Sequence, residues 1–463
     1  MGSRPGSRVA ARCLAVLAVA NGLRAQTVEG ASLGDVVAAA ERAGWTTGVV
    51  VRELQTGRIR YAHRSDRPFI PASNQKLVTV AAALWGLGAE FRFATRFALV
   101  GGVLEVHGGG DPNWLHGTPH AAEQVFDRVA SALRERGVTA LRGVRLVSGV
   151  FTGPARPVGW PSDQLDRDYC APTGALVLEA GCFTARITPT PTRARVELLA
   201  PRADLEFEPG LRVTDRVKKR YAYWLAQSGK RLTSHGEIGA HLPPVEVVGV
   251  SQDPEWLFEQ SLWWSLKQRG ITQRDDAAAV DGAVWTEHSG LTEAIPAILR
   301  ESSNFHAEQL LRVCGARLGD GSFAGGCHAV RDQIGRHVAV PSSLVVVDGS
   351  GLSRDNRVTP GFLVELLRTL CSGPSGRLVL ESLARGGVDG TLRNRFKRRR
   401  ELGRSVRAKT GTIRGVKALT GVVEAPDRTV CLFSILMNGA GKRGHPSAGE
   451  LQERMVAAIH AGR

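Results

Sequence analysis

Hydrophobic and polar positions follow different periods along the chain. Near the N-terminus, apolar residues three or four positions apart predict an amphipathic helix through Leu33 and Ala40. Residues 46–53 and 58–63 then alternate on either side of a Thr-Gly turn, which predicts a β-hairpin. An apolar run over residues 77–84 follows directly and predicts a buried helix.

The pattern changes near residue 91. Short strands are predicted at 93–100 and 103–107, and an amphipathic helix is predicted over 126–133. Further strand-like pieces, interrupted by Pro and Gly, lead to a helix over 256–268 whose three tryptophans are expected in the core. Together these segments predict a long β-rich insertion.

Helical spacing returns at Leu291 and continues to Leu310. Three later segments, 408–413, 416–424 and 429–437, alternate as successive antiparallel strands, and a helix is predicted over 448–461. Mixed helices and strands therefore flank the β-rich region on both sides.

The first 26 residues have a pattern of their own. Arg4, Arg8 and Arg12 precede a short apolar run over 13–20, and small residues follow up to Ala25. This is the pattern of a secretory signal peptide, because the run is too short to span a bilayer comfortably. Since no other stretch is apolar enough to be transmembrane, we expect an exported protein of the periplasm or cell envelope.

The overall charge is strongly basic. Of the formal net charge of +16, four positive charges lie in the signal peptide, which leaves +12. Such a charge favours anionic surroundings, such as wall polymers, an acidic glycan or peripheral contact with a membrane face. Export argues against nucleic acid. The densest basic run, residues 397–400, is interpreted as a solvated loop, with an anchoring patch for an anionic polymer as the alternative.

Six cysteines remain after the signal peptide, an even number that is compatible with disulfides in an exported protein. Cys170–Cys182 and Cys314–Cys327 are plausible pairs by proximity, which leaves Cys371–Cys431. Buried free thiols are an equally weighted alternative. There is no clustered set of Cys and His, so we expect neither a metal site nor a cofactor.

Ser73-x-x-Lys76 stands at the start of the apolar helix. Residues three apart share a helical face, so the serine hydroxyl and the lysine ammonium can meet. A serine hydroxyl needs a base beside it, and a lysine becomes that base when burial or nearby positive charge lowers its pKa. By itself, the spacing equally fits a helix cap at Ser73 with Lys76 in solvent.

Two further motifs occur in the C-terminal half. Ser302-Ser303-Asn304 lies at a predicted helix start, and Lys409-Thr410-Gly411-Thr412 begins a predicted strand. In this order with Ser73-x-x-Lys76, they match the three signatures of penicillin-interactive serine enzymes. Each motif alone has an ordinary alternative, such as a helix cap or an edge strand, but three such coincidences in the right order are improbable.

Longer matches surround these motifs: Gly109-Gly110-Asp111-Pro112, Tyr169-Cys170-Ala171-Pro172, Asp348-Gly349-Ser350-Gly351-Leu352-Ser353-Arg354, Arg357-Val358-Thr359-Pro360 and Gly387-Val388-Asp389-Gly390-Thr391-Leu392. From about Thr46 onwards, the chain closely resembles the D-alanyl-D-alanine carboxypeptidase/endopeptidases, the class C low-molecular-mass penicillin-binding proteins. The resemblance implies an α+β fold, in which a serine β-lactamase/penicillin-binding transpeptidase-like domain carries the insertion. It divides the chain into a signal peptide (1–26), a catalytic domain in two parts (27–90 and 284–463) and one or more inserted β-rich domains (91–283).

The resemblance also implies a function. We expect a serine-type D-Ala-D-Ala carboxypeptidase, and also an endopeptidase, that acts on peptidoglycan stem peptides through an acyl-enzyme and is inhibited by β-lactam antibiotics. Ser73 is expected to be the nucleophile and Lys76 its general base. Ser302 would relay a proton to the leaving nitrogen, and Asn304 would hold Lys76 and the substrate amide. Lys409 would keep the cleft positive and lower the pKa of Lys76 by its like charge.

The third motif is expected to bind substrate through Thr410, Gly411 and Thr412. Its two threonine hydroxyls would bind the terminal carboxylate, and the N–H groups of Ser73 and Thr412 would form the oxyanion hole. No motif assigns a carboxylate for deacylation.

Other residues receive structural or open assignments. His306 matches no family role, and Asp348-Gly349-Ser350-Gly351 is interpreted as a turn, so both are expected to be structural. Trp160, Asp163 and Asp166 lie where relatives contact the peptide side chain. They are candidates for recognising an amino group, with a surface loop as the alternative.

Two other functions fit the same motifs. A β-lactamase or esterase of the same fold is one, because fold and motif do not fix the substrate. The long insertion and the missing deacylation motif favour the peptidase. A non-catalytic scaffold that binds the cell wall through its basic surface is the other.

Overall fold

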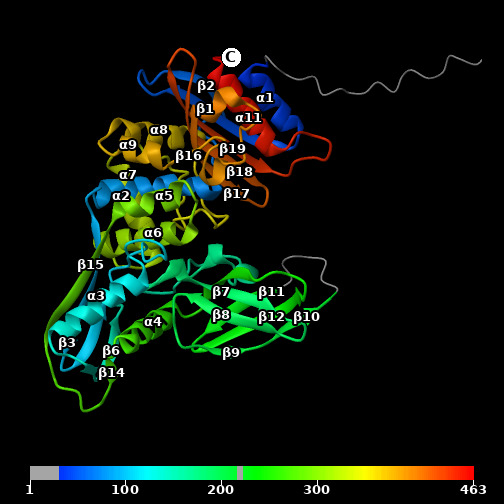
Figure 1. The fold of residues 1–463 in the computed structure, drawn as a ribbon. Helices are drawn as coiled ribbons and strands as arrows, with labels where there is room; N and C mark the ends of the chain where they lie inside the picture. The colour runs from blue at the N-terminus through cyan, green and yellow to red at the C-terminus, as the bar shows by residue number, and fades with distance from the viewer. Residues whose placement is uncertain (1–30, 216–222) are drawn as a thin grey trace, which may run out of the picture.

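The structure, a computed structural model, describes residues 31–215 and 223–463. The predicted signal peptide lies outside the described residues. Two bodies are stacked in Figure 1, with both ends of the described chain in the upper one and the segment between α2 and α5, here called the insertion, below it. No helix among the described residues is long and apolar enough to cross a membrane.

The upper body is built on one six-stranded sheet, to which both ends of the chain contribute. The strand order is β16-β17-β18-β19-β1-β2. The strands are β1 (Trp45–Glu53), β2 (Ile59–His63), β16 (Ala384–Arg385), β17 (Val406–Ile413), β18 (Val416–Glu424) and β19 (Val430–Gly439). β1 runs antiparallel to β19 with Trp45 opposite Gly439, so the predicted hairpin and the three predicted C-terminal strands form a single sheet.

Helices cover both faces of this sheet because its strands alternate between two hydrophobic clusters. Val49 and Val51 face α1 (Leu33–Arg42) and α11 (Ala448–His460), whereas Val50 faces the opposite cluster. That second cluster packs on α2 (Gln75–Gly86), α5 (Leu291–Leu299), α6 (Asn304–Leu318), α7 (Phe323–Gly335), α8 (Pro360–Ser372) and α9 (Gly376–Ser382). The apolar run predicted as a helix is α2, which is buried along most of its length.

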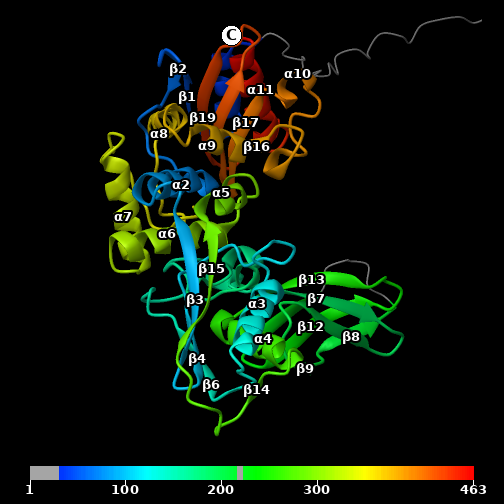
Figure 2. The ribbon, with the colours of Figure 1, turned by 60° about the vertical axis from the view of Figure 1, so that its left-hand side comes forward.

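The insertion begins with a sheet that connects it to the upper body. This sheet has the order β15-β3-β4-β6. Its strands are β3 (Arg92–Val100), β4 (Val103–His107), β6 (Gly143–Val147) and β15 (Gly282–Gly290), and it packs on α3 (Ala122–Glu135) and α4 (Pro254–Gln268). β3 follows α2 and β15 leads straight into α5, and Figure 2 shows these two strands running down together from the upper body. Our proposed domain boundary at 283/284 falls within β15.

A second sheet forms the outer part of the insertion. It has the order β10-β12-β11-β13-β7-β8, with β9 paired to β12. The strands are β7 (Cys182–Pro189), β8 (Ala194–Ala200), β9 (Glu206–Glu208), β10 (Leu211–Thr214), β11 (Tyr223–Ser228), β12 (Arg231–Gly239) and β13 (Val245–Ser251). Phe183, Ile187 and Leu225 fill its core with Leu257 of α4. The predicted α+β fold with a β-rich insertion is confirmed.

Short elements complete the chain: β5 (Ala140–Leu141), β14 (Thr272–Gln273), α10 (Arg400–Gly403) and the 3-10 helices η1 (Ala72–Asn74), η2 (Ser162–Gln164), η3 (Asp168–Cys170), η4 (Glu179–Gly181) and η5 (Gly390–Leu392). All six cysteines of the described residues are free thiols, so the proposed disulfide pairs are wrong and the free-thiol alternative holds. Burial raises the pKa of the Cys314 thiol to about 12, which makes it unreactive.

Candidate active site

Ser73 lies in η1, immediately before α2, and Lys76 lies in the first turn of α2. The Lys76 side chain is fully buried, which excludes the alternative of a solvent-exposed lysine. Ala72, before the serine, has a φ of 46°, a left-handed conformation that costs a residue with a side chain about 1–3 kcal/mol. The tertiary structure therefore holds Ser73 in a turn that the local sequence does not favour.

The Lys76 amine has three oxygen partners. Nζ lies 2.7 Å from Asn304 Oδ1, 2.8 Å from the Ser350 carbonyl and 3.1 Å from Ser73 Oγ. The Asn304 amide is oriented because its Nδ2 donates to the Tyr169 carbonyl at 2.9 Å. A neutral amine has two N–H groups and one lone pair. A protonated Lys76 donates to all three oxygens, whereas a neutral one that keeps its bonds to Asn304 and Ser350 turns its lone pair toward the Ser73 hydroxyl.

Burial lowers the pKa of Lys76 to about 7, while the charges of Glu308 and Asp348 act in the opposite direction. A neutral amine is therefore available near neutral pH. The predicted cause was different, since we expected Lys409 to lower the pKa of Lys76. The structure corrects this, because desolvation dominates. The positive charge of Lys76 acts on Lys409, whose pKa is lowered first by burial and then by Lys76.

The segment interpreted as a turn, residues 348–351, also holds the lysine. Its Ser350 carbonyl accepts from Lys76, and the N–H groups of Gly349 and Ser350 donate to the Glu308 carboxylate at 2.9 and 2.8 Å. Gly351 has a φ of 81°, and a Cβ there would lie 1.9 Å from the Ala72 carbonyl oxygen. Only glycine allows this loop to pack against the turn that carries Ser73.

The second motif meets the third on the other side of Ser73. Lys409 Nζ donates to Ser302 Oγ at 2.8 Å and to the Thr410 carbonyl at 3.1 Å. Ser302 has a φ of 67°, which is not helical, and it lies in the short segment between the end of α5 and the start of α6. The fully buried Lys409 thus holds Ser302 beside β17.

β17 lies close against Ser73. A Cβ on Gly411 would lie 2.8 Å from the Pro71 carbonyl oxygen and 3.1 Å from the Ser73 nitrogen. Asn74 ties the two segments together, because its Nδ2 donates to the Lys409 carbonyl at 3.0 Å while its Oδ1 accepts from Thr420 at 2.6 Å. The backbone of the third motif is therefore held within reach of a group bound at Ser73.

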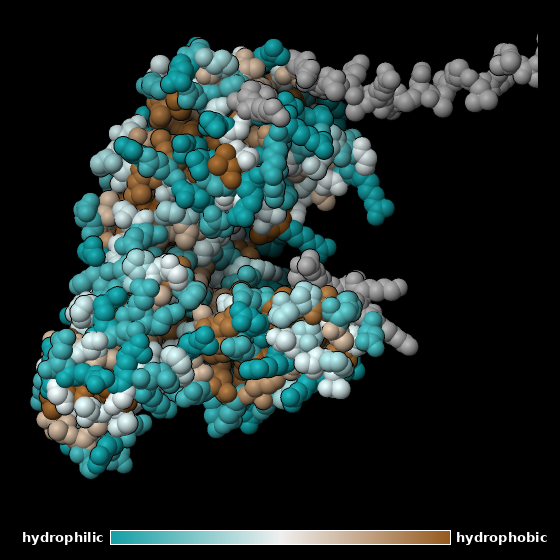
Figure 3. Space-filling model, viewed as in Figure 1, coloured by the Kyte–Doolittle hydropathy of each residue, from teal (hydrophilic) through white to brown (hydrophobic). Residues whose placement is uncertain are grey.

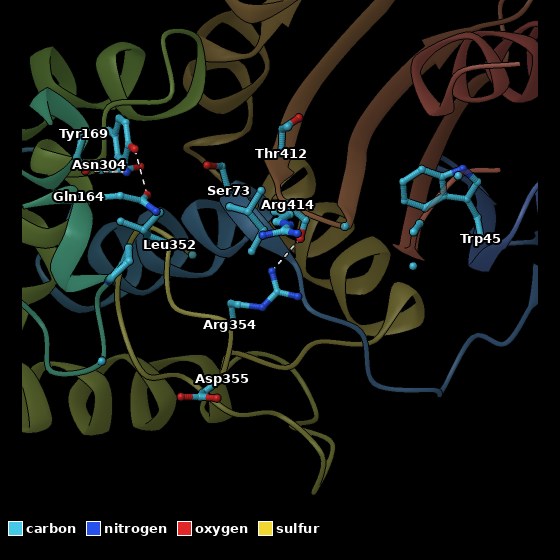
Figure 4. A pocket seen from close by; sticks show the side chains of 18 residues that line it. Trp45, Ser73, Gln164, Tyr169, Asn304, Leu352, Arg354, Asp355, Thr412 and Arg414 are labelled. Atoms are coloured by element: carbon cyan, nitrogen blue, oxygen red, sulfur yellow. Dashed lines mark hydrogen bonds between the residues drawn. The ribbon is translucent and has the colours of Figure 1, made fainter. Parts of the chain in front are cut away.

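Ser73 lines two cavities. The larger, about 1120 Å³, opens between the two bodies, where the surface is hollowed in Figure 3. Figure 4 shows Ser73 near its centre, with Asn304 and Tyr169 on one side, Thr412 above, and Arg354 and Arg414 below. The smaller cavity, about 330 Å³, is lined by Ser73, Ser302, Thr391, Arg395, Thr410, Gly411, Thr412, Lys417, Ala418, Gly449 and Gln452. The two cavities share Ser73 and Thr412, and all three motifs contribute to their lining.

A model of the D-Ala-D-Ala carboxypeptidase 3 (S13) family matches residues 30–460. The chain belongs to the D-Ala-D-Ala carboxypeptidase 3 (S13) family. It is a serine-type carboxypeptidase, and the family resemblance inferred from the motifs is confirmed.

Relatives of this S13 enzyme match along most of their length. It is 30% identical to the D-alanyl-D-alanine carboxypeptidase of Actinomadura sp. (strain R39), over 86% of this chain and 78% of the relative. It is 28% identical to carboxypeptidase DacB of Mycolicibacterium smegmatis, over 88% of this chain and 79% of the relative. Among solved structures, penicillin binding protein 4 (dacB) from Haemophilus influenzae has the same fold, with a TM-score of 0.77, 22% identity and coverage of 92% of this chain and 99% of the other.

Three candidate residues in the insertion of the S13 enzyme have different surroundings. Trp160 is buried and its indole N–H donates to Asp348 Oδ2 at 3.0 Å, so it supports the loop that holds Lys76. Asp163 and Asp166 are exposed, and the adjacent cavity wall is formed by Pro161 and Gln164. Their recognition of an amino group stays a prediction.

His306 has a structural position in the S13 enzyme, as expected. Its ring is buried and its Nδ1 lies 2.8 Å from Ser303 Oγ, which caps α6. Burial lowers the pKa of this histidine to about 4, so it stays neutral. Among the described residues, no group of three or more His, Cys, Asp or Glu side chains is placed to hold a metal ion.

Two side chains that support the site of the S13 enzyme were not among the residues predicted from the sequence. Glu308 follows Asn304 by four positions, so it lies on the same face of α6 and beneath Lys76. That spacing was a usable signal. Asn74 gave no comparable signal, because its partners Lys409 and Thr420 are more than 300 positions away in the sequence.

Proposed function

We propose that this S13 carboxypeptidase cleaves the terminal D-Ala-D-Ala bond of peptidoglycan stem peptides through an acyl-enzyme at Ser73. The observation that carries the proposal is the arrangement around Lys76, whose two N–H groups are occupied by Asn304 and Ser350 while its third contact is Ser73. A neutral lysine in this position accepts the Ser73 proton as the hydroxyl attacks the penultimate alanine carbonyl.

The tetrahedral intermediate carries a negative oxygen. The N–H groups of Ser73 and Thr412 are our candidates for its donors, and removing one such donor ordinarily costs roughly 3 kcal/mol of transition-state stabilisation. The close approach of Gly411 to the Ser73 nitrogen supports this pairing of donors.

Collapse of the intermediate breaks the C–N bond, and the leaving nitrogen needs a proton. Ser302 Oγ is the proposed donor, since it lies in the smaller cavity and receives a hydrogen bond from Lys409. The proton that Lys76 took from Ser73 replaces the one that Ser302 gives up, so the protein returns to its starting protonation state. The Thr410 and Thr412 hydroxyls would bind the terminal carboxylate, and water then hydrolyses the acyl-enzyme.

The proposal also includes endopeptidase activity on cross-linked peptides. We assign the smaller cavity to the leaving group because Ser302 lines it, and its volume of about 330 Å³ falls within the range of pockets that accept drug-sized ligands. A single alanine does not fill it, so the leaving amine can carry the remainder of a cross-linked peptide. Substrates of this kind lie in the cell wall, and the signal peptide predicted over residues 1–26 supports export.

Penicillin binding is part of the same proposal. A Haemophilus influenzae penicillin binding protein 4 of this fold was solved in complex with a β-lactam, with a TM-score of 0.71 and 20% identity, over 92% of this chain and 98% of the other. A β-lactam presents a strained amide and a carboxylate, and Ser73 would attack that amide as it attacks the peptide.

The experiment uses fluorescent penicillin and purified muropeptides with the wild type and a Ser73→Ala variant. We expect covalent labelling and release of D-alanine by the wild type only, detected by mass. A wild type that stays unlabelled and inactive would favour the wall-binding scaffold. A labelled wild type that turns over its penicillin adduct within seconds would favour the β-lactamase.

A further inference from the structure

Lys417 is a cation of the smaller cavity without an acidic partner. It lies on β18 directly opposite Thr412 of β17, and its Nζ donates to Thr412 Oγ1 at 3.2 Å. The side chain is half-buried, and among the ion pairs of the described residues none includes Lys417. A buried or half-buried ammonium is ordinarily paired, so this one is available for an anion.

Arg395, the second cation of the cavity, does have an acidic partner. The Arg395 guanidinium donates to Glu453 Oε1 at 2.9 Å, to the Gly449 carbonyl at 2.7 Å and to Gln452 Oε1 at 3.1 Å. These contacts fix Arg395 against α11 and leave it as a stationary positive charge. Burial, and then the charge of Arg395, lower the pKa of Lys417. The cavity therefore favours the entry of a negative charge.

The lining of this cavity supplies no such charge. It contains the hydroxyls of Ser302, Thr391, Thr410 and Thr412 but no carboxylate. The Thr410 hydroxyl donates to the Thr391 hydroxyl at 2.8 Å, and Lys417 donates to the Thr412 hydroxyl. Apart from Arg395 and Gln452, the polar side chains of the lining are therefore hydroxyls and one ammonium, Lys417, that has no acidic partner among the described residues. A carboxylate is the anion that the proposed function supplies, because Ser302, the proposed proton donor to the leaving nitrogen, lines this cavity together with Ser73.

We infer that Lys417 recognises the free carboxylate of the leaving D-amino acid, acting with the Thr410 and Thr412 hydroxyls, and so makes this enzyme selective for leaving groups that carry an α-carboxylate. The inference rests on the proposed function and adds a specificity-determining residue outside the three motifs. It applies equally to a terminal D-alanine and to a cross-linked residue that keeps its α-carboxylate. It excludes esters and amides of the C-terminus as good substrates.

The test compares two peptides that differ only at the C-terminus, one ending in D-Ala-D-Ala carboxylate and the other in D-Ala-D-alaninamide. The enzymes are the wild type, Lys417→Met, Lys417→Arg and a control, Lys267→Met, which removes an exposed charge on α4 in the insertion. We expect the wild type to prefer the carboxylate. In Lys417→Met, kcat/KM should fall at least tenfold on the carboxylate peptide, mainly through KM, and change less than threefold on the amide. Lys417→Arg should restore most of the preference, and Lys267→Met should match the wild type.

Other outcomes overturn the inference. An equal loss on both peptides would mean that Lys417 only positions Thr412 or β17. An unchanged preference in Lys417→Met would mean that the carboxylate is recognised elsewhere. Inhibition by free D-alanine relative to D-alaninamide gives a second measurement, which should lose its selectivity in Lys417→Met alone. Wild-type cleavage of the carboxylate peptide tests the proposed function separately, and a wild type that cleaves neither peptide would overturn both.

Discussion

Lys76 Nζ lies 2.7 Å from Asn304 Oδ1, although 228 positions separate the two residues in the chain. The whole insertion lies between them. Because β3 leaves the upper body after α2 and β15 returns beside it into α5, the chain comes back to the point from which it departed. The insertion can therefore be long without separating Ser73, the proposed nucleophile, from the residues that orient Lys76, its proposed base.

The rate of acylation by penicillin should depend on pH through Lys76. Burial lowers the pKa of this amine to about 7, and only the neutral form accepts the Ser73 proton. The acylation rate should rise with pH to a plateau above about 7 and fall tenfold per unit below it. Labelling time courses across this range measure the profile. Lys76→Arg should abolish labelling at every pH, because arginine stays protonated. A flat profile in the wild type would contradict the assigned base.

Glu308→Gln should move the acid limb of that profile to lower pH. An ionised Glu308 raises the pKa of Lys76, and burial raises the pKa of Glu308 itself to about 8, so the two groups titrate together. Glutamine removes the ionised form and so lets the amine stay neutral at a more acidic pH. The amide oxygen can still accept from Gly349 or Ser350, and we expect a loss of about 1–3 kcal/mol in unfolding free energy. Glu246→Gln, on an exposed ion pair of the outer sheet, is the control and should leave the profile in place. A shift to higher pH would show that another group sets the pKa of Lys76.

Gly351→Ala should displace the turn that carries Ser73. Gly57→Ala is a matched control, because Gly57 also has a positive φ, of 72°, but no atom lies within 4 Å of the position that an added methyl group would take. The control should cost about 1 kcal/mol of unfolding free energy for the backbone conformation. Gly351→Ala should cost about 1–3 kcal/mol more from the collision with the Ala72 carbonyl and should acylate at least tenfold more slowly. Thermal unfolding and penicillin labelling test both variants. Equal effects would mean that the close contact is unimportant.

Trp160→Phe should affect activity more than stability. It removes the hydrogen bond from the insertion to Asp348, but Asp348 Oδ2 keeps its bond from the Ser353 N–H at 2.6 Å. We expect a loss of about 1 kcal/mol in unfolding free energy, from one hydrogen bond. The loop that holds Lys76 would be less well positioned, so kcat/KM should fall severalfold. If kcat/KM stays unchanged while stability falls, the tryptophan serves only the packing between the two bodies.

Local patterns predicted most elements correctly because each depends on neighbouring residues. The alternation over residues 46–53 and 58–63 is a hairpin, and the apolar run over 77–84 is a buried helix. Both follow from the side-chain period of a strand or helix. The predicted disulfide pairs were wrong because two cysteines that are close in sequence need not have their side chains close in space.

The sequence by itself determined that Ser73, Lys76, Ser302, Asn304 and Lys409 belong to one kind of chemistry, because their spacing and order match a known set of motifs. Only the tertiary structure decided the burial, the pKa and the contacts of each side chain. Burial lowers the pKa of Lys76 to about 7. The loop interpreted as a simple turn brings the Ser350 carbonyl to Lys76 and donates to Glu308 of α6. Lys417 lines a cavity whose lining contains no carboxylate. These properties arise from desolvation and from contacts between segments hundreds of residues apart, and no local pattern encodes either.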